Sequence, residues 1–250
     1  QRFNRMNNSF HTIIYQKNGK VASIILNRPH VLNAHNIQMR DDLYQILEAA
    51  RDDTDVTCIT LTGAGERSFC TGADLTEFGT APSRVIARQV RWERDLWGLI
   101  LSINKPIIAG LHGYVLGSGM EMAMLCDIRI ASDDAVFGMP EAALGMIPVA
   151  GGTQILPRTI GIGKTMRLLL THKNISAQEA KDIGAVNEVV NRESLWHHVF
   201  KAAEQISSHD GLSLETIKGN LRNGLDRPLL EAMNSEYNTA LNMIMAKTLY

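Results

Sequence analysis

The feature that most constrains this fold is an alternation of strand-like and helix-like patterns through the first 150 residues. Apolar strand-like runs at 12–16 and 21–26 flank an Asn-Gly turn, and a third run lies at 56–62. Between the second and third runs, apolar residues recur at i, i+3, i+4 and i+7, the spacing of a helix with one apolar face. These residues are Leu43, Ile46, Leu47 and Ala50.

The same rhythm repeats further along the chain. We expect one long helix at 84–101, a strand at 106–111, a helix beginning near Ser118, and strands at 127–131 and 135–137. Strands that alternate with helices predict an α/β fold in which helices cover the strands.

From about Gly151 the pattern becomes almost wholly helical, and only 186–190 resembles a strand. Ser176 and Glu179 form a capping box that opens one of these helices. No linker rich in Pro or Ser separates the two parts. We therefore expect a core at residues 1–190, followed by a helical region at 191–250.

Charge and cysteine content exclude several functional classes. The 250 residues include 25 Lys and Arg against 26 Asp and Glu, a net charge of -1 that would not gather nucleic acid or a membrane surface. No apolar run approaches the ~18 residues of a membrane span, and the polar first ten residues lack a secretory signal. Three widely spaced cysteines favour a reduced, cytoplasmic location. We expect the natural start to lie upstream of Gln1 or at Met6.

Two glycine-rich stretches imitate nucleotide-binding motifs without completing them. Gly161–Thr165 ends like a phosphate-binding loop, but Arg158 stands where that loop needs a glycine. Gly117–Met122 begins like a dinucleotide fingerprint and lacks its last glycine. We therefore expect no nucleotide cofactor, and we expect the eight histidines to be surface or structural residues.

Three segments concentrate small residues that secondary structure alone does not require. The first is Ser68–Leu75, the second is Gly113–Glu121 and the third is Phe137–Gln154. Small residues leave backbone amides uncovered, and a turn that opens a helix directs its amides and its positive dipole end at a ligand. Two such amides can form an oxyanion hole for a polarised carbonyl.

Two glutamates lie in these segments among apolar neighbours. Glu121 is placed in the first turn of the second segment's helix, and Glu141 follows Pro140 in the third segment. Apolar surroundings raise the pKa of a carboxyl group, which suits proton transfer near neutral pH. The alternative is that each glutamate only complements a helix dipole, which is the commoner role of a lone Glu near a helix start.

Taken together and in this order, the segments closely resemble the enoyl-CoA hydratase family, also called the crotonase superfamily. The likeness runs from about His11 to Val190 and includes Asn27-Arg28-Pro29 with Leu32-Asn33-Ala34, which resemble the family's segment at the CoA side of the pocket. It implies that the amides of Ala73 and Ser118 contact the thioester oxygen. By the same resemblance Glu121 activates water for attack on C3, and Glu141 delivers a proton to C2.

The resemblance also implies the substrate contacts and the assembly. Ala73, Asp74, Leu75, Thr76 and Ser118 would bind an acyl-CoA thioester, with no metal and no cofactor apart from the CoA of the substrate. The implied fold is a spiral of strand-strand-helix turns with a C-terminal helical region that forms homotrimers or homohexamers. Because hydratases of the family keep both glutamates, the implied reaction is reversible hydration of a 2-enoyl-CoA to a 3-hydroxyacyl-CoA.

Alternatives within and outside this chemistry remain open. They are double-bond isomerisation, hydration of a cyclic dienoyl-CoA, and a non-catalytic binding role. The chain departs from the family at Ser118, where glycine is common, and at Val149, which replaces a glycine and narrows the pocket near the water. The family's C-terminal tail is expected to be missing after Tyr250.

Overall fold

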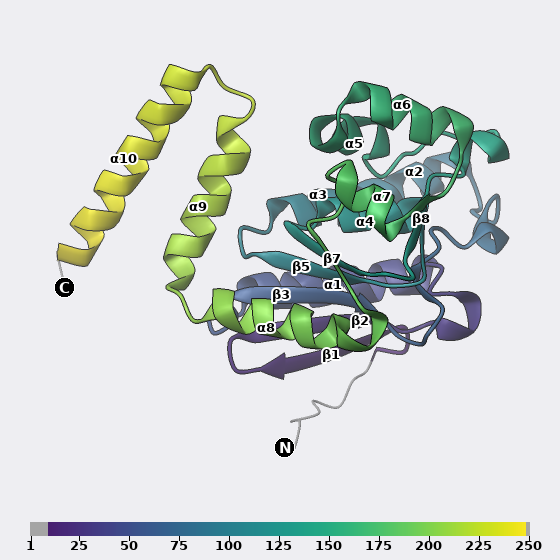
Figure 1. Ribbon diagram of the computed structural model, residues 1–250, viewed down its shortest axis with the longest axis horizontal. Helices are drawn as coiled ribbons and strands as arrows, with labels where there is room; N and C mark the ends of the chain where they lie inside the picture. Colours follow the sequence, from purple (N-terminus) through teal and green to yellow (C-terminus); the bar gives the residue numbers. More distant parts are fainter. Residues whose placement is uncertain (1–9, 249–250) are drawn as a thin grey trace.

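A computed structural model describes residues 10–248 of the chain. Expectations about the first nine residues and about the end of the chain fall outside these described residues. Within them, the strands form two sheets, one of six strands and one of four (Figure 1). No helix among residues 10–248 is long and apolar enough to cross a membrane.

The larger sheet has the strand order β1-β2-β3-β5-β7-β10. Its first two strands pair antiparallel and the other neighbours pair parallel. The strands are β1 (Ile13–Asn18), β2 (Val21–Leu26), β3 (Cys58–Gly63), β5 (Ile107–Leu111), β7 (Ile128–Ser132) and β10 (Glu188–Val190). Six of the seven predicted runs, at 12–16, 21–26, 56–62, 106–111, 127–131 and 186–190, fall on these strands within two residues at either end, and the seventh, at 135–137, falls on a strand of the smaller sheet.

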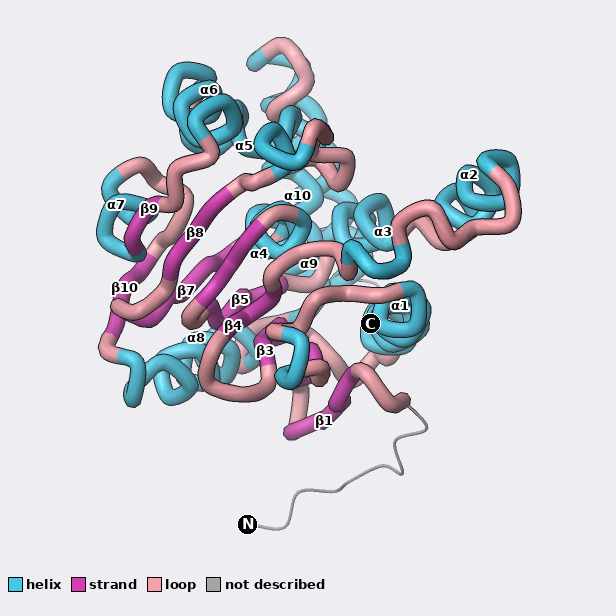
Figure 2. Tube along the Cα trace, turned by 90° about the vertical axis from the view of Figure 1, so that its right-hand side faces the viewer, coloured by secondary structure: helices cyan, strands magenta, loops and turns pink. Residues whose placement is uncertain are grey.

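The smaller sheet has the order β4-β6-β8-β9, in which β4, β6 and β8 run parallel and β9 runs antiparallel to β8. The strands are β4 (Ser68–Cys70), β6 (Tyr114–Leu116), β8 (Val136–Gly138) and β9 (Ile175–Ser176). Three successive passes of the chain, which contain β3 and β4, then β5 and β6, then β7 and β8, therefore each add one strand to the larger sheet and one to the smaller sheet before a helix. This arrangement is the expected strand-strand-helix spiral (Figure 2).

Ten α-helices lie within residues 10–248. They are α1 (Ile37–Asp52), α2 (Arg84–Glu93), α3 (Leu96–Ser102), α4 (Ser118–Leu125), α5 (Gly152–Ile160), α6 (Ile162–Thr171), α7 (Ala177–Asp182), α8 (Leu195–Ser207), α9 (Gly211–Gly224) and α10 (Leu229–Thr248). The predicted apolar face of α1 is buried. The Ser176 half of the predicted capping box of α7 is formed, because Ser176 Oγ accepts from Glu179 N at 3.2 Å, whereas Glu179 Oε1 lies 3.0 Å from Arg167 Nη2.

Two sequence expectations about secondary structure were wrong. The single helix expected at 84–101 is two helices, because Asp95 turns away from helical geometry and its carboxylate caps α3 by accepting from Gly98 N at 3.1 Å. Strand β9 is a second strand in the part of the chain where we expected only 186–190. Its two residues are too few for a period-2 pattern to register.

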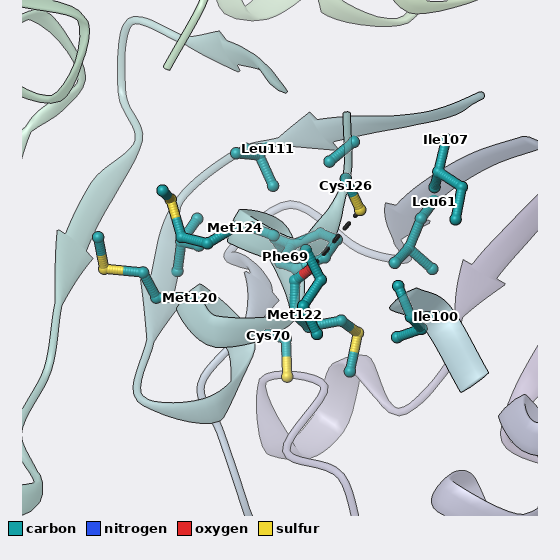
Figure 3. Close-up of a cluster of buried hydrophobic side chains, with 14 of the residues drawn as sticks. Leu61, Phe69, Cys70, Ile100, Ile107, Leu111, Met120, Met122, Met124 and Cys126 are labelled. Atoms are coloured by element: carbon teal, nitrogen blue, oxygen red, sulfur yellow. Dashed lines mark hydrogen bonds between the residues drawn. The ribbon is translucent and has the colours of Figure 1, made fainter. Parts of the chain in front are cut away.

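Helix α4 carries the second segment through the centre of the core. Its buried methionines Met120 and Met124 point to one side of the helix and Met122 points to the other (Figure 3). All residues of α4 after Ser118 are buried. A helix packed on every side holds its residues in fixed directions, and Glu121 is one of them.

The C-terminal helices divide between the core and its periphery. Helix α8 packs on β3, β5 and β7 and buries Leu195, Val199 and Ala203 against the larger sheet. Helices α9 and α10 form a hairpin that extends away from the body (Figure 1). Asp127 ties α9 to the sheet through Lys218 at 2.6 Å and Arg222 at 3.0 Å.

Candidate active site

The three small-residue segments converge because each follows a parallel strand of the smaller sheet. The first leaves β4 after Cys70, the second leaves β6 after Leu116, and the third leaves β8 after Gly138. These strands are neighbours in the order β4-β6-β8, so their carboxyl ends lie at one edge of the sheet. Ligands of parallel sheets bind at this edge, where the connecting loops meet.

A cavity of about 540 Å³ opens where the three segments meet. Ala73, Ser118, Glu121 and Glu141 all line it, so residues far apart in the sequence share one site. Apolar side chains complete most of the wall. These are Leu75, Phe78, Pro140, Leu144, Met146, Ile147 and Val149.

The backbone of the first segment directs the Ala73 amide away from its neighbouring strand segment. Ala73 forms a parallel bridge with His35, in which His35 N donates to Gly72 O at 2.8 Å and Asp74 N donates to His35 O at 3.0 Å. In such a bridge the central residue's own N–H and C=O point to the opposite side. The Ala73 amide is therefore available on the side away from His35.

The second segment places the backbone amide of Ser118 close to the first segment. Ser118 is the first residue of α4, and the first amides of a helix have no partner within it. A Cβ atom added to Gly72 would lie only 3.3 Å from Ser118 N, so the two segments touch at this glycine. The expected pair of amides is thus assembled from adjacent loops.

Glu121 is fixed by the third segment. The residue is 2% exposed, and its Oε1 accepts hydrogen bonds from Ala150 N at 3.0 Å and Gly152 N at 2.6 Å. Gly152 begins α5, so the carboxylate lies at the positive end of that helix. A Cβ on Gly152 would come within 2.9 Å of Glu121 Oε1, which explains why this position needs glycine.

Glu141 has a different environment in the same cavity. It begins the 3-10 helix η3 (Glu141–Leu144), and among residues 10–248 its buried Oε2 has no hydrogen-bond partner. Burial raises the pKa of Glu141 above its ordinary value, which confirms the shift predicted for this residue. Glu141 Oε1 would lie 2.9 Å from a Cβ added to Gly117, so the carboxyl lies against the residue that precedes α4.

The three residues after Ala73 line a cavity, support the loop that carries Ala73, or do both. Leu75 lines the main cavity, whereas Asp74 lines an adjoining cavity of about 490 Å³ that shares Ala73 and Phe78 with it. Asp74 Oδ1 accepts from the amide and the hydroxyl of Thr76, and Thr76 lines neither cavity. Hydrogen bonds from Thr76 and Arg28 lower the pKa of Asp74.

The segment at 27–34 supports the first segment, including the loop that carries Ala73. Arg28 Nη1 lies 3.0 Å from Asp74 Oδ2 and donates to Ala34 O at 2.6 Å. The side chain of Asn33 is buried and donates to Ala64 O and Ser68 O, both at 2.9 Å. These contacts hold the chain on both sides of β4, and thereby position Ala73.

A family model described as enoyl-CoA hydratase/isomerase matches residues 16–248. The chain belongs to this family. It is 38% identical to the short-chain-enoyl-CoA hydratase of Clostridium acetobutylicum, over 85% of this chain and 82% of that protein. It is also 38% identical to the crotonyl-CoA hydratase of Syntrophomonas wolfei, over 91% of this chain and 88% of the relative.

Solved structures of family members have the same fold. An enoyl-CoA hydratase subunit from Geobacillus kaustophilus superposes with a TM-score of 0.88 at 35% identity, covering 95% of this chain and 91% of that one. The resemblance and the fold predicted from the three segments are thereby confirmed.

Contacts that cross between segments could not be predicted from the sequence. The amides that hold Glu121 come from residues 150 and 152, and no local pattern links them to the glutamate. His35, which we expected to be a surface or structural residue, contacts Ser118 directly, with 2.7 Å between His35 Nε2 and Ser118 Oγ. Among residues 10–248 no three His, Cys, Asp or Glu side chains are placed to share a cation.

Proposed function

We propose that this protein is an enoyl-CoA hydratase, which adds water reversibly across the 2,3 double bond of a 2-enoyl-CoA thioester to give a 3-hydroxyacyl-CoA. The observation that carries the proposal is one cavity lined by two unlike glutamates and two loop amides. One carboxylate is anchored by amides, and the other is buried with a raised pKa. The names of the two hydratase relatives support the same reaction.

The amides of Ala73 and Ser118 would bind the thioester oxygen. When water attacks C3, the electrons of the double bond move toward that oxygen, and an enolate develops. Donors that are already held in place stabilise this charge without reorganising. Loss of one such donor typically lowers kcat by about 10²–10³-fold. Gly72 would keep the approach to Ser118 N open because it has no side chain.

The two glutamates would carry the protons. Ionised Glu121 takes one proton from the attacking water, whose oxygen forms the new bond to C3. Protonated Glu141 gives its proton to C2, and exchange with solvent then returns both groups to their starting states. Burial favours the protonated form of Glu141, so the environments match the two roles. The sum adds one water and transfers no electrons, so no redox partner enters, and CoA is present only as part of the substrate.

The acyl chain that this cavity suits is apolar. Apart from Glu121 and Glu141, the side chains that line it are uncharged, and several are exposed apolar groups such as Phe78, Leu144 and Ile147. We assign Leu75 to the acyl chain, and Asp74 and Thr76 to the loop that faces the CoA part. Val149 would limit the width of the cavity near the attacking water.

We further propose that the region at 191–250 mediates self-association as a homotrimer or homohexamer. The support is a series of exposed apolar side chains on the α9–α10 hairpin, including Leu221, Leu225, Leu229 and Leu230. A patch of this kind is typical of an interface. Leu225→Asp combined with Leu229→Asp should therefore yield a smaller species in analytical ultracentrifugation. An unchanged sedimentation coefficient would count against this assignment.

We place the reaction in the cytoplasm. The support is that Cys58, Cys70 and Cys126 are free and buried, as is usual in a reducing compartment. Fractionation of the native host tests this, and recovery of the protein from an organelle or an exported fraction would contradict it.

The test of the reaction is to mix the purified protein with crotonyl-CoA and follow the enoyl-thioester absorbance. Hydration should remove the absorbance and give a product whose mass is greater by one water. A product of unchanged mass would indicate double-bond isomerisation instead. Hydration of a cyclic dienoyl-CoA but not of crotonyl-CoA would assign another substrate, and binding without turnover of any enoyl-CoA would indicate a non-catalytic protein.

A further inference from the structure

His35 contacts both of the loops that carry the candidate oxyanion amides. Its backbone holds the first loop, donating to Gly72 O at 2.8 Å and accepting from Asp74 N at 3.0 Å. Its side chain reaches the second loop, where Nε2 lies 2.7 Å from Ser118 Oγ. One residue therefore bridges the two residues whose amides would share the thioester oxygen.

The side-chain contact anchors the start of α4 at a position that otherwise lacks a side-chain cap. The residue before the helix is Gly117, which has no side chain to bond the first amides. Ser118 is the first helical residue, and its hydroxyl is held from outside the helix by His35. A glycine at 118 would leave the amide in place but would remove this anchor.

The ring of His35 is itself held in position. It packs edge-on against Trp97 of α3, with the ring centroids 5.8 Å apart. The charged groups around it are Arg40 on α1, Asp74 in the first loop and Arg28. Burial, together with the two arginines, lowers the pKa of His35 to about 4, so the imidazole is neutral near pH 7. It can hydrogen-bond to Ser118 without placing a competing charge beside the developing enolate.

We propose that His35 is a positioning residue that fixes the separation of the Ala73 and Ser118 amides. This inference rests on the proposed hydratase reaction. The expected effect is on kcat more than on KM, because the amides stabilise charge that develops mainly in the transition state. Loosening one donor should cost less than removing it, so we expect a loss of about tenfold in kcat.

The experiment compares His35→Leu, Ser118→Ala and the double variant with crotonyl-CoA as substrate. Each single variant should lower kcat by about tenfold with KM within about twofold, and the double variant should be no slower than either one. His35→Gln should recover most of the activity, because its amide nitrogen can reach the position of Nε2. Wild-type kcat in Ser118→Ala, or additive losses in the double variant, would overturn the proposal.

The chain offers a matched control in His112. Like His35, it packs edge-on against a tryptophan, with 5.4 Å between its ring centroid and that of Trp196, and its Nε2 contacts a loop oxygen, Gly65 O, at 3.0 Å. It lines neither cavity, whereas His35 lines the adjoining one. His112→Leu should lower the melting temperature and leave kcat unchanged. A kcat loss in His112→Leu equal to that of His35→Leu would reduce the role of His35 to packing.

A spectroscopic measurement keeps this inference separate from the proposed reaction. Butanoyl-CoA has the same thioester carbonyl but no double bond to hydrate. Hydrogen bonds to that carbonyl lower its infrared stretching frequency, so the bound band should shift back toward the free value in His35→Leu. A band in His35→Leu at the same frequency as in the wild-type protein would overturn the positioning role. If the wild-type protein shifts the band and His35→Leu loses that shift, but no enoyl-CoA is hydrated, the proposed reaction fails and the positioning role stands.

Discussion

Gly72→Ala tests whether the Ser118 amide is a donor in the reaction. Gly72 has a φ of 98°, a region that L-residues with a Cβ disfavour. Its added Cβ would lie 3.2 Å from Leu116 O and 3.3 Å from Ser118 N, so the neighbouring backbone must move by a few tenths of an ångström. The substitution therefore strains the loop and displaces the proposed donor.

The two effects have different magnitudes and different readouts. The positive φ costs about 1–2 kcal/mol of stability, which is about 2–8 °C in melting temperature for a chain of this size. Displacing the Ser118 amide should lower kcat by about 10²-fold, the lower end of the range for one lost oxyanion donor. Stability is measured by thermal unfolding and kcat by the loss of enoyl-thioester absorbance.

Gly184→Ala is the control for backbone strain. Gly184 has a φ of 86°, and no atom lies within 4 Å of the Cβ it would gain. This variant should lose a similar amount of stability while its kcat remains that of the wild type. If Gly72→Ala lowers stability but keeps kcat within about twofold of the wild type, the Ser118 amide is not a donor and the reasoning is refuted.

Three further expectations follow from the same structure. His112 Nδ1 is buried without a partner among residues 10–248, and burial lowers the pKa of His112 to about 4. The unfolded chain therefore binds a proton at this histidine at a higher pH than the folded chain, and His112 accounts for a loss of roughly 3 kcal/mol of stability as pH falls from about 6.5 to 4. His35, whose pKa is also lowered to about 4, accounts for a similar loss. His112→Gln should therefore remove about half of the slope that these two histidines give the pH–stability curve measured by urea unfolding. The ionisable groups that line the cavity are Glu121 and Glu141, so its lining offers no cation to a substrate carboxylate. An enoyl-CoA whose chain ends in a carboxylate should therefore have a kcat/KM about tenfold or more below that of crotonyl-CoA. Equal values would contradict the assignment of the cavity to an apolar chain. Val149→Gly should raise kcat/KM for a branched enoyl-CoA relative to crotonyl-CoA by up to about tenfold, and an unchanged ratio would show that Val149 does not limit the cavity.

The sequence predicts the core of strands and helices well because its longer elements have clear apolar patterns. Helix α1 has one apolar face, whereas β2 and β5 are continuous runs of small and apolar residues, as is usual for strands buried on both faces. Strands β4 and β6 were not predicted because they lie inside the small-residue segments, whose glycines and small side chains favour turns. The helix at 84–101 was predicted as one element because an N-cap such as Asp95 is visible only when its carboxylate meets the Gly98 amide.

For the site, the sequence identifies the segments but not their contacts. Small residues and acidic residues at turns are visible in the chain, so Ala73, Ser118, Glu121 and Glu141 could be selected. Their meeting in one cavity depends on the pairing of β4, β6 and β8, which brings together residues up to 68 positions apart along the chain. The bond between His35 and Ser118 spans 83 positions and leaves no trace in local patterning.

The central claim is that Glu121 and Glu141 divide the proton transfers of hydration between them. Its most direct test is the kcat of Glu121→Gln and of Glu141→Gln with crotonyl-CoA, alongside the affinity of each variant for butanoyl-CoA. Each substitution removes one proton-transfer group and nearly preserves its volume, so kcat should fall by about 10²–10⁴-fold while butanoyl-CoA binding stays within a few-fold of the wild type. Hydration at the wild-type rate by either variant would contradict the account.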